Sequence, residues 1–119
     1  MIKITERGWC AHFCGGSRCN FRSTTHIEFN ENWVVVSTVG QFRKLNGDGY
    51  EEIGLNRHYE TMAFEAIFEN PYWEADIAKQ LSFDSPWSIS ELEFETDKKA
   101  NDMHENAVKE FCERITNAL

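Results

Sequence analysis

The sequence has few of the features that mark membrane, secreted, low-complexity or duplex-DNA-binding proteins. Its 119 residues include two prolines, Pro71 and Pro86. No apolar run approaches the roughly 18 residues that a membrane-spanning helix needs, and residues 1–7 contain no secretory apolar block. Basic residues number 12 against 20 acidic ones, a net charge of −8 that argues against a general binder of duplex DNA. These absences predict a cytosolic protein with no membrane contact.

The residues that are present are typical of one globular domain. Hydrophobic residues make up 41% and aromatic residues 13%, enough for a single core, so one domain spanning 1–119 is predicted. Charge is uneven along the chain. Residues 1–57 carry seven basic and six acidic side chains, whereas residues 58–119 carry five and fourteen. This division either draws a small anionic ligand to the first half or is ordinary solvated surface charge.

Two segments rich in β-branched and aromatic residues, Thr24–Phe29 and Trp33–Gly40, predict a β-hairpin with its turn at residues 30–32. The run Val34–Val36 is apolar on both faces of a strand, so the second strand is expected to be central and covered on each side. Gly40 predicts a bulge or a close approach by another backbone.

Residues 46–49 (Asn-Gly-Asp-Gly) predict a second tight turn. The next two segments, 58–69 and 72–83, fit either strands or helices, because their apolar residues satisfy both periodicities. Their aromatic content and the β character of the preceding chain favour strands, joined by a turn at residues 69–72.

The C-terminal segment has one apolar stripe at helical spacing, from Ala100 to Leu119. Thr96 or Asp97 is suited to cap its start, and the acidic residues just before it complement the helix dipole. The predicted fold is therefore α+β: an antiparallel β-sheet followed by a C-terminal amphipathic α-helix. The expected divisions are a β-rich part at 1–84, a connecting loop at 85–96 and the helix at 97–118.

Thiols and imidazoles near the N-terminus raise the question of zinc. Zinc sites usually hold paired Cys-x2-Cys ligands, and the Cys-x3-Cys-x4-Cys spacing here lacks them. Structural thiols are therefore the favoured interpretation, zinc is the alternative, and disulfides are not expected in the cytosol. The group in question is Cys10, Cys14 and Cys19 with His12 and His26.

No catalytic signature is present: the chain has no Walker loop, dinucleotide-binding fingerprint, nucleophile elbow or His-Glu-x-x-His motif. An enzyme is therefore the less favoured interpretation, kept as an alternative because catalytic groups are brought together in space and not in sequence, and no cofactor is expected. Residues 15–18 (Gly-Gly-Ser-Arg) form either a simple turn or a contact to phosphate through backbone N–H groups.

Aromatic residues flank a proline in the segment 83–87, Phe-Asp-Ser-Pro-Trp. Phe83 and Trp87 either fill the seam between helix and sheet or stack on a flat base. In the second case Arg57, Arg18 or Arg22 would hold the phosphates through forked hydrogen bonds.

Four strings taken together resemble a phage family, the Thoeris anti-defence proteins that act as sponges for signalling nucleotides. The similarity lies in these strings, their order and the chain length, so it spans most of the sequence. The strings are residues 9–13 (Trp-Cys-Ala-His-Phe), 19–22 (Cys-Asn-Phe-Arg), 35–40 (Val-Val-Ser-Thr-Val-Gly) and 53–62 (Ile-Gly-Leu-Asn-Arg-His-Tyr-Glu-Thr-Met).

The resemblance implies a non-catalytic protein of the infected bacterial cytoplasm. It would sequester cyclic ADP-ribose isomers made by TIR-domain enzymes and leave them intact; some members also hold cyclic oligonucleotides at a second site. It further implies a homo-oligomer, a dimer or hexamer, with pockets shared between protomers, and a fold like the one expected above. Matched to this sequence, the ligand-binding residues would be Arg57, Phe83 and Lys109.

Two alternatives remain. The acidic run from Glu91 to Glu113 suits an inhibitor that binds a host defence protein as a nucleic-acid mimic. The thiols and imidazoles suit a small zinc-stabilised domain. Neither the isomer bound nor the subunit number follows from the sequence.

Overall fold

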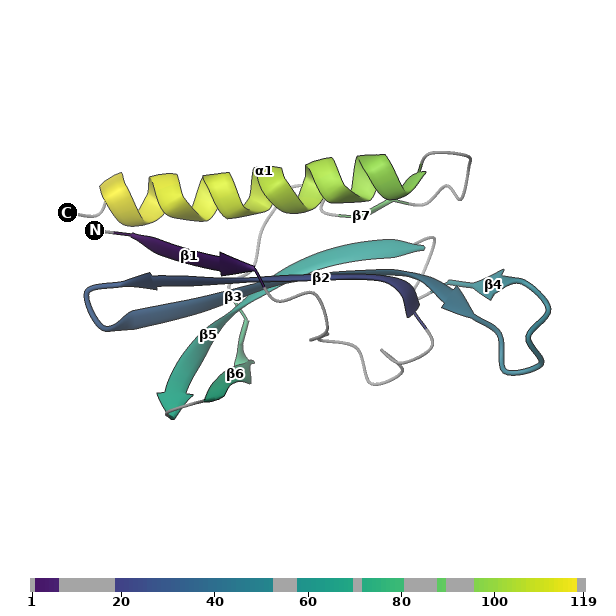
Figure 1. The fold of residues 1–119 in the computed structure, drawn as a ribbon, viewed down its shortest axis with the longest axis horizontal. Coiled ribbons are helices and arrows are strands. Elements are labelled where there is room, and N and C mark those ends of the chain that lie inside the picture. Colours follow the sequence, from purple (N-terminus) through teal and green to yellow (C-terminus); the bar gives the residue numbers. More distant parts are fainter. Residues whose placement is uncertain are drawn as a thin grey trace.

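The computed structural model describes residues 2–6, 19–52, 58–69, 72–80, 88–89 and 96–117. The predicted α+β class is confirmed: one antiparallel sheet has the order β1-β2-β3-β5-β6, and a helix lies over one of its faces (Figure 1). Two short strands extend the sheet, because β4 pairs with β3 and β7 pairs with β5. The elements are β1 (Lys3–Glu6), β2 (Cys19–Phe29), β3 (Asn32–Arg43), β4 (Tyr50–Glu51), β5 (Tyr59–Glu69), β6 (Tyr72–Gln80), β7 (Ser88–Ile89) and α1 (Thr96–Asn117).

The expected hairpin is formed by β2 and β3, with Phe29 opposite Asn32. Its two linking residues both have positive φ, 45° at Asn30 and 64° at Glu31. Positive φ at both positions is the mark of the type I′ turn, whose twist matches that of the flanking strands. The Asn32 side chain closes the turn by donating from Nδ2 to the carbonyl of Asn30, 3.1 Å away.

The prediction that β3 is a central strand buried on both faces is confirmed. It lies between β2 and β5, and Val34, Val35 and Val36 are 8%, 4% and 0% exposed. Side chains alternate across a strand, so burial of three in a row requires cover on each side of the sheet.

The predicted Asn-Gly-Asp-Gly turn joins β3 to β4. Gly47 and Gly49 have φ of 76° and 89°, values that favour glycine. The Asp48 amide donates to Asn46 Oδ1 at 2.9 Å, and the Lys44 amide donates to the Gly49 carbonyl at 3.0 Å.

The segments that were open to two readings are strands. β5 pairs with β3 along the register Trp33↔Ala66 to Gly40↔Tyr59, and β6 pairs with β5. The helical alternative is therefore wrong, because pairing with β3 decides what periodicity alone left open. Residues 70 and 71 of the expected turn and residues 81–83 of the expected second strand lie outside the described residues. The expected connecting loop 85–96 also contains β7, a short strand that the sequence did not predict.

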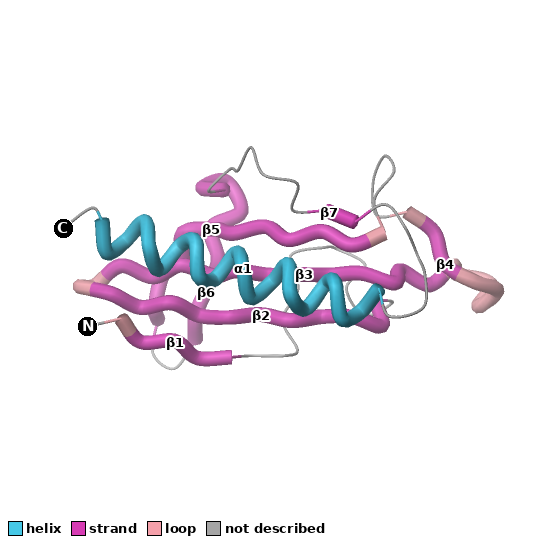
Figure 2. The backbone as a smooth tube through the Cα atoms, turned by 90° about the horizontal axis from the view of Figure 1, so that it is seen from above, coloured by secondary structure: helices cyan, strands magenta, loops and turns pink. Residues whose placement is uncertain are grey.

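The helix α1 begins and ends one residue earlier than predicted and crosses over β2 and β3 in Figure 2. It packs its stripe against the sheet in one apolar cluster, with Ile2 and Cys112 at the margin. The side chains of the proposed caps, Thr96 and Asp97, lie outside the described part of the chain. Within the described ranges, no helix combines the length and the apolar character that a membrane span requires. The members of the apolar cluster are Ile27, Val34, Val36, Ala63, Ala107, Val108 and Phe111.

One polar side chain interrupts this apolar stripe. His104 is 0% exposed and contacts a threonine hydroxyl through each ring nitrogen: Thr25 Oγ1 lies 2.8 Å from Nε2, and Thr38 Oγ1 lies 2.7 Å from Nδ1. A third hydroxyl, that of Thr61, lies 2.6 Å from Thr38 Oγ1. Buried polar groups need such partners, and here they come from β2, β3 and β5. We call these four residues the His104 network.

Candidate functional site

The most informative part of the sheet is the end where β5 begins and β7 joins it. Two adjacent cross-strand rows run there: Phe21–Gly40–Tyr59–Ile89 and Arg22–Val39–Glu60–Ser88. Paired residues on neighbouring strands point to the same face. We call this region the Gly40 end; it comprises Cys19–Arg22, Val39–Phe42, His58–Glu60 and Ser88–Ile89.

Aromatic packing fixes the first row. Tyr59 is fully buried, and a Cβ on Gly40 would come within 2.6 Å of Tyr59 Cγ. The Phe21 ring meets the Tyr59 ring edge to face, with 5.7 Å between centroids and 73° between planes. The close approach expected at Gly40 therefore occurs, but the group that approaches is a ring and not a backbone. The expected bulge is not formed, because the pairing of β2 with β3 continues through this position without a register shift, although the neighbouring Gln41 has a φ of 52°.

Backbone hydrogen bonds tie His58 into this end. The Gln41 amide donates to the His58 carbonyl at 3.2 Å, and the His58 amide donates to the Ile89 carbonyl at 2.8 Å. His58 directly follows Arg57, and Ser88 directly follows Trp87. The chain thus brings together the described neighbours of two predicted site residues that are 30 positions apart in sequence.

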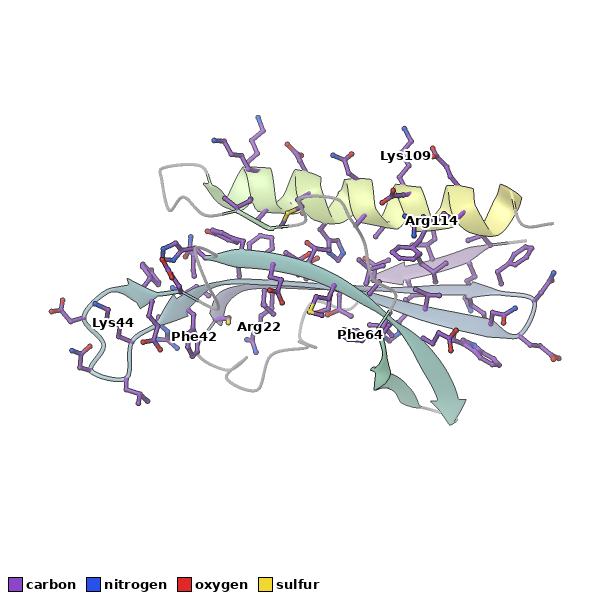
Figure 3. The ribbon with its side chains drawn as sticks, turned by 180° about the vertical axis from the view of Figure 1, so that it is seen from behind. Arg22, Phe42, Lys44, Phe64, Lys109 and Arg114 are labelled. Carbon is purple, nitrogen blue, oxygen red and sulfur yellow. The ribbon has the colours of Figure 1, made fainter. Side chains whose placement is uncertain are left out.

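Two more predicted site residues, Arg22 and Arg18, lie at this end or next to it in sequence. Arg22 is exposed in the second row, whose members lie on the face of the sheet away from α1, and Figure 3 shows its side chain below the sheet. Cys19, which directly follows Arg18, is 3% exposed and packs with Val39 and Phe42. Arg18, Arg57, Phe83 and Trp87 themselves lie outside the described residues.

Lys109 is placed elsewhere. It is exposed on α1 and points away from the sheet, on the opposite side of the molecule from Arg22 (Figure 3). The sheet and the helix lie between the two side chains. Within one chain, Lys109 and Arg22 therefore do not line the same pocket.

The zinc alternative loses part of its ligand set. Cys19 and His26 are seven residues apart on one continuous strand, β2, a separation of about 23 Å at 3.3 Å per residue. A tetrahedral zinc ion holds its ligand atoms at about 2.0–2.3 Å, so two side chains this far apart cannot bind the same ion. Within the ranges that the structure describes, no group of three metal-binding side chains is found. Cys10, His12 and Cys14 lie outside those ranges.

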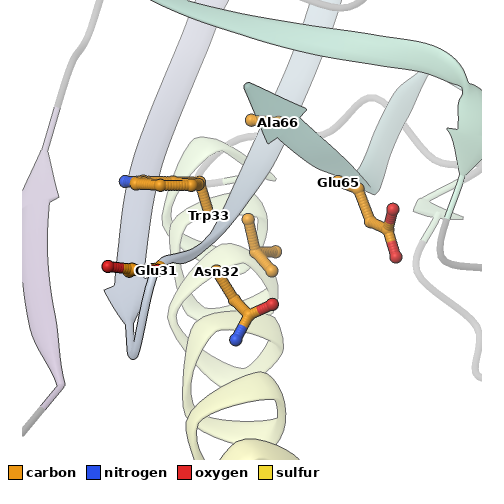
Figure 4. A pocket seen from close by; sticks show the side chains of 6 residues that line it. Glu31, Asn32, Trp33, Glu65 and Ala66 are labelled. Atoms are coloured by element: carbon orange, nitrogen blue, oxygen red, sulfur yellow. The ribbon is translucent and has the colours of Figure 1, made fainter. Parts of the chain in front are cut away.

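A hollow of about 290 Å³ lies at the other end of the sheet, beside the Asn30–Glu31 turn (Figure 4). Trp33 forms part of its wall, and two carboxylates, Glu31 and Glu65, also line it. Trp33 and Gly40 are seven residues apart on β3, about 23 Å. Carboxylates repel phosphate, so this hollow does not suit the nucleotide that the resemblance implies.

The residues that sequence reasoning missed are the partners of His104. The sequence placed His104 on the helix stripe, but nothing in it named the threonines. The available signal was a histidine at a core position together with threonines at strand positions. No protein-family model, curated protein or solved structure matches this chain, so its own residues must carry the functional assignment.

Proposed function

We propose that this protein is a phage anti-defence sponge that binds a cyclic ADP-ribose-type signal and releases it unreacted. The observation that carries the proposal is the meeting of His58 and Ile89 at the Gly40 end. In sequence, His58 directly follows Arg57 and Ile89 is two positions after Trp87, so both proposed ligand residues are close along the chain to this contact. Arg22 is exposed on the same end. Guanidinium groups bind diphosphates through paired hydrogen bonds, and rings stack on bases.

The position of Lys109 suggests how the site would be completed. Because Lys109 lies across the molecule from Arg22, it would join a nucleotide at the Gly40 end only from a second protomer. An oligomer, as the resemblance implies, supplies that second wall and the enclosure that a chain of 119 residues lacks. A sponge must bind its signal at about nanomolar concentration, equivalent to about −12 kcal/mol, and this requires a largely enclosed ligand.

The charge pattern on α1 does not favour the acidic-mimic alternative. Its outer face interleaves Lys98, Lys99 and Lys109 with carboxylates, and Arg114 Nη2 lies 3.3 Å from Glu110 Oε1. A mimic of nucleic acid needs a continuous anionic surface, which alternating charges do not provide.

The proposal is tested by calorimetry with cyclic ADP-ribose isomers on the full chain, comparing the natural protein with Phe83→Ala. We expect tight binding by the natural protein and a loss of about 1–3 kcal/mol in the variant, the usual contribution of one stacked base. Trp33→Phe, which changes a ring at the other end of β3, is the matched control and should bind like the natural protein. No binding by the natural protein, or equal binding by Phe83→Ala, would overturn the proposed site.

A further inference from the structure

The His104 network joins α1 to three strands at once. Thr25 on β2 and Thr38 on β3 lie 2.8 and 2.7 Å from the two ring nitrogens, and Thr61 on β5 extends the chain of hydroxyls. The ring of His104 is fully buried, and the threonines are 0–3% exposed. A neutral imidazole donates from one nitrogen and accepts at the other, and hydroxyls can rotate to serve either role. The network therefore satisfies the neutral ring in either tautomer.

Both ring nitrogens of His104 contact hydroxyls, so a protonated ring would have no carboxylate as its direct hydrogen-bond partner. The polar groups that reach it are hydroxyls, which carry no negative charge. Two titratable residues lie on the network's side of the sheet: Glu6 of β1 is paired with Thr25, and Cys112 of α1 is at the margin of the apolar cluster. On the neighbouring strands, pairing directs the other charged or titratable side chains to the opposite face or places them farther along, and on α1 they point to solvent. These side chains are Arg22, His26, Glu28 and Glu60 on the opposite face, Tyr59, Arg43 and Glu65 farther along the strands, and Lys98, Lys99, Asp102, Glu105 and Lys109 on the exposed side of α1.

Among the described residues, the apolar packing of α1 differs on the two sides of His104. After it, Ala107, Val108 and Phe111 belong to the cluster that covers the sheet. Before it, Ala100 is fully buried but small, and Met103 is half-buried. Apolar stabilisation grows with buried area, so the first half of α1 depends more on the His104 network than the second half does.

We propose that the His104 network is an acid-sensitive latch, which holds residues 96–104 of α1 on the sheet and releases them when His104 is protonated. An imidazolium requires solvation that three neutral hydroxyls cannot supply. Lifting the weakly packed half of the helix gives the ring access to water, while Val108 and Phe111 keep the second half in place.

The direction of the effect follows from linkage. Burial lowers the pKa of His104 from 6.5 to about 4. Above pH 6.5 the ring is neutral in both the latched and the released state, and the latch has its full stability. As the pH falls below 6.5 the released state takes up the proton first, so the latched state loses stability until the pH reaches about 4. Between pH 7 and pH 5 this shift favours release by about 20-fold.

The test measures amide hydrogen exchange of the full chain between pH 7 and pH 5, corrected for intrinsic exchange rates, in the natural protein and in His104→Gln. We expect protection of residues 96–104 to fall about 20-fold in the natural protein, with a smaller fall at residues 107–114. His104→Gln should lack this pH dependence. His26→Gln, which changes a buried histidine on the opposite face of the sheet, should retain it.

An equal fall in His104→Gln, or equal falls in both halves of α1, would overturn the latch. If His104→Gln fails to fold, titration of the His104 ring by NMR in the natural protein decides the matter. A midpoint well below 6.5 accompanied by loss of α1 signals supports the proposal, and a midpoint near 6.5 with α1 still protected contradicts it.

Discussion

The ring of Tyr59 fills the space that a side chain on Gly40 would need, since a Cβ there would lie 2.6 Å from Tyr59 Cγ. Gly40 is on the central strand β3 and Tyr59 is fully buried, so neither can move away easily. This contact holds the start of β5 in register, next to the residue that follows Arg57.

Gly40→Ala should therefore destabilise the fold by about 2–3 kcal/mol, the upper part of the range for overpacked sites. Urea unfolding measures the change. Gly47→Ala is the control: it has a φ of 76° but no atom within 4 Å of the added methyl, so only backbone strain of about 1 kcal/mol is expected. Equal losses in the two variants would show that the Tyr59 contact is not tight.

The turn between β2 and β3 offers a stabilising change. Glu31 has a φ of 64°, which costs an L-residue with a side chain about 1–2 kcal/mol. Glu31→Gly would create the Asn-Gly pair preferred in this turn and should raise the free energy of unfolding by about 1 kcal/mol. Glu28→Gly, in the adjacent strand, should lower it by a similar amount. A decrease for both variants would contradict the turn geometry.

Each threonine of the His104 network is expected to contribute to the free energy of unfolding in proportion to the number of its hydrogen-bond partners. Thr38→Val keeps the shape but removes the hydroxyl that contacts both His104 and Thr61, and should cost about 2–3 kcal/mol. Thr61→Val removes one contact to a hydroxyl that still has another partner, so about 1 kcal/mol is expected. Thermal and urea unfolding at pH 7.5 would measure both, and the reverse order would contradict the network.

Much of the fold could be predicted because it follows from local pattern. The Val34–Val36 run indicated a central strand, Asn and Gly residues marked the turns, and the period from Ala100 onward gave α1 to within one residue at each end. The choice of strands at 58–69 was correct because aromatic and β-branched residues suit a sheet, although periodicity alone did not decide it.

What could not be predicted depends on register between distant strands. A shift of one residue turns every side chain to the opposite face. Gly40 indicated a close approach without revealing Tyr59, and His104 gave no indication of Thr38 or Thr61. The same register, with the side of the sheet on which α1 packs, places Lys109 and Arg22 on opposite sides of the molecule.

Two substitutions of Arg57 distinguish the effect of its forked hydrogen bonds from the effect of its charge. Arg57→Lys keeps the positive charge but loses the paired donors, whereas Arg57→Ala loses both. Binding of a cyclic ADP-ribose isomer should weaken in both variants, and more in Arg57→Ala. Arg114→Ala, which changes an exposed arginine already paired with Glu110, is the matched control and should bind like the natural protein. Normal binding by Arg57→Lys would show that the forked contact has no role, and equal losses in the two Arg57 variants would show that the charge alone contributes nothing.

The central claim is that the protein binds a nucleotide and leaves it intact. In the most direct test, the purified chain is loaded with cyclic ADP-ribose isomers and free ligand is removed. The protein is then denatured by heat, and the released compound is identified by mass spectrometry. The account predicts stoichiometric recovery of the unchanged cyclic nucleotide. Recovery of a hydrolysed product would make the protein an enzyme, and absence of any bound nucleotide after loading at micromolar concentration would contradict the account altogether.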